Sequence, residues 1–219
     1  MSVVAYCVEH GASRRHPSPP VRQFVAALVM LGLAGSAWGA DMYKEQTAIP
    51  MSHVQAIDLH VSAGDVHLVQ GTQAGSAWLR YTVKRMGTNA SAPVPHVSNG
   101  VGAIDVNVDG GNGSEIDAEL VVPAGTRVAI TSAGGNIDIG SVTGDKEVNL
   151  TAGDVKVAVG DLYRDIDAAT RIGDIHSAKG LSTAAQQNVG MTGKSMTMRG
   201  PGHYSLRVRV AVGDVYLNQ

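Results

Sequence analysis

The chain has 219 residues, of which 44% are hydrophobic, 16% charged and 4% aromatic, and its formal net charge is −2. This charge excludes a protein that binds nucleic acid through a broad basic face, because such a face neutralises many phosphates. Ample Val, Ile and Leu argue against a disordered chain, and the single cysteine, Cys7, excludes a disulfide scaffold and a thiolate zinc site.

The N-terminal region predicts an export signal. An apolar run, FVAALVMLGLA at residues 24–34, follows Arg22. At about 1.5 Å per residue this run is too short to cross a hydrocarbon core about 30 Å thick. It is typical of the hydrophobic region of a signal peptide. Residues 1–20, with three prolines, are unusual for such a signal, so we expect translation to start near Val21.

Small residues after the apolar run indicate where the signal is removed. Ala37 and Gly39 favour cleavage before Ala40, and cleavage after Ala37 is the alternative. We therefore expect residues 1–39 to be a signal peptide and residues 40–219 to be one exported domain, without a transmembrane segment, in the periplasm or outside the cell.

The first half of the expected domain predicts β-strands with long connections. Apolar and polar residues alternate at 57–61, 79–83 and 104–108, as in half-buried strands. Residues 88–102 read as a loop. We expect residues 46–125 to form antiparallel strands that cap the rest of the fold and protect its end from edge-to-edge pairing.

A short unit then recurs, in which Gly and Asp or Asn precede an apolar-x-apolar stretch. Its copies are Gly64-Asp65, Gly135-Asn136, Gly153-Asp154, Gly173-Asp174 and Gly213-Asp214. Glycine permits a positive φ at a corner, and Asp can bond nearby backbone N–H groups there. A coil of this length buries its apolar face only by stacking. Residues 126–217 therefore predict a short β-solenoid of about four or five rungs, with an irregular rung at 182–202 and almost no helix.

One further motif gives a family resemblance. The stretch LVVPAGTRV at 120–128, followed by Gly-Asp-Val-x-Val units, resembles the bacterial putative-adhesin family, a domain of unknown function similar to the head GIN adhesin-like domain. The resemblance covers about residues 54–217. It implies an exported right-handed β-solenoid without known enzymatic activity. Asn136 departs from the family pattern, as does the irregular rung at 182–202.

Candidate metal ligands have simpler structural explanations. Asp65, Asp154, Asp174 and Asp214 could form a column that binds Ca²⁺, but we expect each to cap its own turn. His60 and His67 flank one turn and would pair across a two-residue hairpin, where they could bind Zn²⁺ or Cu²⁺. At a solenoid corner they would point apart, and we interpret them as solvated. We therefore expect no metal and no cofactor.

Carboxylates close in sequence raise the alternative of an enzyme that acts on polysaccharide. They are Asp105, Asp109, Glu115, Asp117 and Glu119. These acids alternate with apolar residues, as solvent-facing strand positions do. Trp78 and Tyr81 have opposite strand parity, so they do not make one aromatic platform. We therefore expect no catalytic residues.

The remaining candidates are exposed positions on the strands. Lys194, Arg199, Arg207 and Arg209 predict a modest positive patch, and Arg207 and Arg209 are the predicted binding face. Asp138, Lys156 and His176 are further exposed candidates. The sequence thus predicts a non-enzymatic adhesin-like module for an envelope component or protein partner. An accessory or scaffold protein of envelope stress or assembly is the alternative, and an edge-to-edge homo-oligomer is open.

Overall fold

A computed structural model describes residues 42–51, 56–73, 75–85, 95–99, 102–110, 114–178, 185–190 and 192–218. The predicted signal peptide, its cleavage positions and the predicted start near Val21 lie outside these residues. All regular structure described is β-strand, which confirms the all-β class. In the described part of the chain, no helix is long and apolar enough to cross a membrane.

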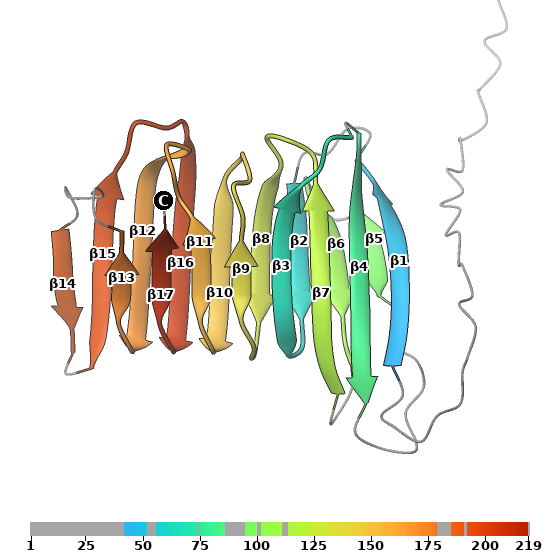
Figure 1. Cartoon of the computed structure of the whole chain (residues 1–219), viewed down its shortest axis with the longest axis horizontal. Coiled ribbons are helices and arrows are strands. Elements are labelled where there is room, and N and C mark those ends of the chain that lie inside the picture. Colours follow the sequence, from blue (N-terminus) through green and yellow to red (C-terminus); the bar gives the residue numbers. More distant parts are fainter. Residues whose placement is uncertain are drawn as a thin grey trace, which may run out of the picture.

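The strands form two large sheets that lie face to face along one elongated body (Figure 1). The eight-stranded sheet has the order β1 (Met42–Pro50), β4 (Ser76–Arg85), β7 (Ser114–Val122), β3 (Gly64–Gln70), β9 (Ile137–Ile139), β11 (Val155–Ala158), β17 (Val215–Asn218) and β13 (Ile175–Ser177). The nine-stranded sheet has the order β14 (Ala185–Val189), β15 (Gly193–Arg199), β12 (Tyr163–Ile172), β16 (Tyr204–Val212), β10 (Lys146–Ala152), β8 (Arg127–Ser132), β2 (Ala56–Val61), β6 (Ile104–Val108) and β5 (His96–Asn99).

The chain passes repeatedly from one sheet to the other. A strand of the nine-stranded sheet is followed by a strand of the eight-stranded sheet, and we call each such pair a rung. The rungs are β2/β3, β6/β7, β8/β9, β10/β11, β12/β13 and β16/β17, and neighbouring rungs pair in parallel in both sheets. Alternating side chains point between the sheets, where they form one apolar core.

The spatial order of the rungs differs from their order in the chain. Rung β6/β7 lies outside β2/β3, and the last rung, β16/β17, lies between β10/β11 and β12/β13. The end of β17 is therefore in the body of the molecule (Figure 1). The structure thus shows two mixed, mostly parallel sheets, and it does not confirm a solenoid with sequential coils.

Antiparallel strands extend both sheets at one end of the stack and the nine-stranded sheet at the other end, where β13 is the edge of the eight-stranded sheet. At one end β4 pairs with β7 and β1, and β5 pairs with β6. At the other end the hairpin β14–β15 pairs with β12. The predicted antiparallel cap over residues 46–125 is met only by β1, β4 and β5, because β2, β3, β6 and β7 belong to the parallel stack. Strands β14 and β15, within the predicted irregular rung, form the second cap.

Candidate functional site

The five Gly-Asp units stack at one edge of the two sheets, where each rung turns from one sheet into the other. Backbone bonds link neighbouring corners, such as Gly64 N–H to the Gly134 oxygen at 2.8 Å and Gly153 N–H to the Val212 oxygen at 2.9 Å. The corner of β12/β13 lies last in the row, after that of β16/β17. A single continuous row of corners results.

The Asp and Asn side chains connect these corners. In four of the five units, the Oδ1 accepts a hydrogen bond from the backbone N–H at the equivalent position of the next rung. The bonds run from Asn136 to Asp65 at 2.7 Å, from Asp154 to Asn136 at 3.3 Å, from Asp214 to Asp154 at 2.9 Å and from Asp174 to Asp214 at 2.7 Å. The expected capping of each residue's own turn is therefore replaced by a bond between rungs. We call this row the aspartate ladder.

The ladder ends at Asp174, where the hairpin β14–β15 begins to cover the stack. The Lys194 ammonium lies 2.5 Å from the Asp174 Oδ1, and its hydrogen bond and charge lower the pKa of Asp174. The Gly173 N–H donates to the Thr192 oxygen at 3.2 Å. A lysine and a loop carbonyl thus occupy the positions that a further rung would take.

The predicted histidine pair is separated by its corner. His60 lies in β2 of the nine-stranded sheet and His67 in β3 of the eight-stranded sheet, and both side chains are exposed. β2 and β3 do not pair with each other, so the hairpin that would join the two imidazoles does not form. In the residues that the structure describes, no three His, Cys, Asp or Glu side chains are grouped to hold a metal ion.

His67 instead belongs to a row of polar side chains that crosses the eight-stranded sheet. Strand register aligns Glu119, His67, Asp138, Lys156, Tyr216 and His176. The rings of His176 and Tyr216 stack with their centroids 4.7 Å apart. Three residues that the sequence indicated as exposed candidates, Asp138, Lys156 and His176, thus share one outer face.

The carboxylates weighed for catalysis fall on two opposite faces. Asp105 lies in β6 of the nine-stranded sheet, whereas Glu115, Asp117 and Glu119 lie in β7 of the other sheet. Glu119 accepts a hydrogen bond from Arg80 at 2.7 Å. Asp109 follows β6 at the edge, exposed. The structure does not bring this set together.

The predicted arginine pair shares a face but not an environment. Arg209 donates to the Asp167 carboxylate and, at 3.0 Å each, to the backbone oxygens of Asp167 and Val208. The Arg207 Nε lies 4.0 Å from the Asp167 Oδ2, and its side chain is 60% exposed. Arg209 is therefore held within the sheet surface, while Arg207 extends into solvent.

Arg207 borders a hollow of about 440 Å³ on the outer face of the nine-stranded sheet, which we call the charged hollow. Strands β8, β10, β12, β15 and β16 contribute to it. Its ionisable residues are Arg127, Asp145, Lys146, Glu147, Asp165, Asp167, Arg199 and Arg207. Sequence analysis found only its arginines on β15 and β16, because the hollow joins residues up to 80 positions apart.

Lys146 is the buried cation beside this hollow, and sequence reasoning missed it. Its ammonium donates to the backbone oxygens of Thr126 at 3.0 Å, Thr143 at 3.0 Å and Gly144 at 2.8 Å. Burial lowers the pKa of Lys146 to about 8, against the charge of Asp145. A signal was present, since Lys146 has the strand parity of the buried Val148 and Leu150.

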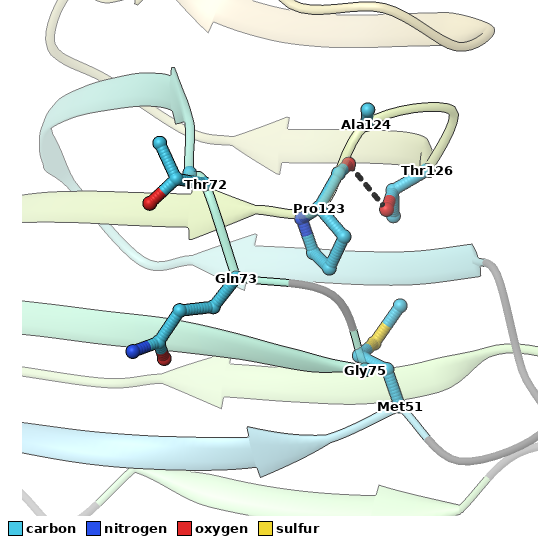
Figure 2. Close-up of a pocket in the computed structure, with 8 residues that line it drawn as sticks. Met51, Thr72, Gln73, Gly75, Pro123, Ala124 and Thr126 are labelled. Carbon is cyan, nitrogen blue, oxygen red and sulfur yellow. Dashed lines mark hydrogen bonds between the residues drawn. The ribbon is translucent and has the colours of Figure 1, made fainter.

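A second hollow, of about 240 Å³, lies at the rim formed by residues 71–73, Gly75 and the 123–126 turn (Figure 2). This turn belongs to the motif on which the family resemblance rests. The Thr126 hydroxyl donates to the Pro123 oxygen at 2.8 Å, and Met51 lies at the other side. The described lining has no ionisable side chain, so the charged hollow is the stronger candidate site.

Comparisons with known proteins address the fold. No protein-family model matches the chain, and no curated protein matches it. The chain is similar to the crystal structure of a putative cell adhesion protein from Clostridium sporogenes ATCC 15579, with a TM-score of 0.52 and 10% sequence identity. The similarity covers 82% of this chain and 100% of that chain. At this identity the likeness shows the fold alone, and the family resemblance stays a prediction.

Proposed function

We propose that the protein is an exported, non-enzymatic, adhesin-like binding module of the bacterial cell envelope. The observation that carries the proposal is the alignment of polar side chains in register across the outer faces of both sheets. Parallel ladders and the aspartate ladder hold these rows rigidly, so binding a repetitive ligand costs little conformational entropy. The fold shared with a putative cell adhesion protein supports the same function.

Export to the periplasm or beyond it follows, in this proposal, from the signal peptide at residues 1–39. In this proposal the stacked rungs form a short right-handed β-solenoid, although their spatial order differs from their order in the chain. The acids weighed from the sequence lie on two faces, so that set does not provide the pair of carboxyl groups, one on either side of a bond, that a polysaccharide-cleaving enzyme needs.

The test is retention of the purified protein on separated envelope fractions, namely outer membrane, peptidoglycan and soluble periplasm. Two single variants identify the face, because Arg207→Ala alters the nine-stranded sheet and Lys156→Ala alters the eight-stranded sheet. We expect retention on one insoluble fraction, weakened by one of these variants only. Capture of one discrete soluble protein, with no retention on insoluble material, would instead support the accessory-protein alternative.

A further inference from the structure

The charged hollow contains four carboxylates, and contacts within the protein satisfy three of them. Asp145 accepts from the Ser205 N–H at 2.8 Å and from its hydroxyl at 2.9 Å. The Arg164 Nε donates to Asp165 at 2.8 Å, and Asp167 accepts from Arg209. These acids are therefore neutralised or bonded locally, and they repel an anionic ligand less than their number indicates.

The three arginines of the charged hollow, unlike these carboxylates, are not hydrogen-bonded within the described part of the protein. Arg127 lies 3.8 Å from Glu147, Arg199 lies 3.8 Å from Asp165, and Arg207 lies 4.0 Å from Asp167. These separations exceed hydrogen-bond length, and the three side chains are 62%, 90% and 60% exposed. Within the described residues, none of the three makes a hydrogen bond. Their guanidinium donors therefore face solvent and remain available to a ligand.

The positions of the arginines select an extended ligand. Arg199 is on β15, Arg207 on β16 and Arg127 on β8, and one strand separates each from the next. With about 4.8 Å between strands, Arg199 and Arg127 are roughly 19 Å apart, and Arg207, which lies two residues further along its strand, is roughly 12 Å from each of them. One phosphate or carboxylate cannot reach all three. In a polysaccharide with an anionic group on every second sugar unit, the distance between successive charges is similar to the distance between neighbouring arginines.

The rest of the lining narrows the ligand class. Its apolar side chains, Ile166, Met198 and Leu206, are buried, so they offer an acyl chain little surface. It has no aromatic ring on which bases could stack. Carboxylates between the arginines accept hydrogen bonds from hydroxyl groups and oppose a densely charged polyanion.

We propose that the charged hollow binds an acidic polysaccharide that runs across the strands from β15 to β8, with its carboxylates on Arg199, Arg207 and Arg127 and its hydroxyls on the intervening acids. This inference rests on the proposed binding function and names its ligand class. Guanidinium groups suit the task because they bind carboxylates through two parallel N–H donors.

The test measures binding of the purified protein to hyaluronan oligosaccharides, which carry one carboxylate per disaccharide, and to the same oligosaccharides after reduction of the carboxylates to alcohols. We expect binding to hyaluronan that weakens with salt and is lost on reduction. Loss of one charged hydrogen-bonded contact in Arg207→Gln should raise Kd about tenfold or more. Arg80→Gln, an exposed arginine on the opposite sheet, should change Kd less than twofold.

Equal binding of the native and reduced oligosaccharides, equal losses in the two variants, or no binding to hyaluronan would each overturn the proposal. Thermal unfolding of both variants checks that they are folded. Retention on an envelope fraction that is insensitive to Arg207→Gln would reject this ligand site while the proposed function stands. Absence of retention on every fraction would reject the binding function itself.

Discussion

The two edges at which the chain crosses between the sheets are built in different ways. At the lower edge in Figure 1 five corners repeat a glycine followed by an aspartate or asparagine, and four of these side chains are bonded to the next rung. At the opposite edge, residues 123–126 and 140–145 form a single network. There the Gly125 N–H donates to Thr143, Thr143 donates to Gln70, and Lys146 binds three carbonyls.

The difference shows two ways to satisfy backbone groups at the end of a sheet. A repeated corner distributes its hydrogen bonds over many rungs, so each side chain contributes little alone. A unique network concentrates them on one side chain, and its removal leaves several carbonyls unpaired. The glycines of the repeated corner are an exception to this small contribution. Stacking brings the backbones of neighbouring corners into direct contact there, so a side chain would not fit.

The largest loss of unfolding free energy is therefore expected when a corner glycine is replaced. Gly153 has φ of +126°, and a Cβ there would lie 1.9 Å from the Gly135 carbonyl oxygen. Gly153→Ala should lower the free energy of unfolding by about 3–5 kcal/mol or prevent folding. Urea unfolding followed by circular dichroism measures the change.

Gly160→Ala is the matched control, because Gly160 also has a positive φ, +45°, but no atom lies within 4 Å of its added Cβ. Its cost should be about 1 kcal/mol, from backbone conformation alone. Equal losses in the two variants would show that the stacked corner is not the source of the effect.

The second effect concerns Lys146 at the opposite edge. Lys146→Met preserves much of the side-chain volume but leaves the three backbone acceptors without the ammonium. Unsatisfied buried groups of this kind cost about 1–3 kcal/mol, and we expect a loss in that range in urea unfolding at pH 7. An unchanged unfolding midpoint would mean that water replaces the ammonium at this edge.

The pH dependence of stability provides the control for Lys146. Its folded-state pKa is about 8, whereas an unfolded lysine holds its proton to about pH 10.4. The unfolded chain binds more protons between these values, so the unfolding free energy should rise with pH across this window. Lys146→Met should lack this rise. Above about pH 10 both proteins should lose stability, because burial raises the pKa of Tyr81 and Tyr163 and only their unfolded forms ionise.

The repeated edge could be predicted from the sequence, whereas the order of the rungs could not. Each Gly-Asp unit is a local signal, since positive φ and alternating burial need only adjacent residues. Five of the six rungs have this same pattern, so nothing local specifies that β16/β17 lies between β10/β11 and β12/β13. The charged hollow depends on that order, because Arg207 reaches the hollow only through the insertion of β16 between β12 and β10.

The smallest loss of unfolding free energy is expected in the aspartate ladder. There the side chain that accepts the hydrogen bond can be replaced without changing the corner glycine. Asp154 accepts the Asp214 N–H at 2.9 Å, and its removal in Asp154→Ala should cost about 1 kcal/mol, the value of one partly exposed hydrogen bond. Asp154→Asn should cost much less, because Asn136 already performs this role at the neighbouring rung, where its Oδ1 accepts the Asp154 N–H at 3.3 Å. If Asp154→Asn is as destabilised as Asp154→Ala in urea unfolding, the carboxylate charge matters more than the acceptor. The ladder would then depend on electrostatics between rungs, which high salt should weaken.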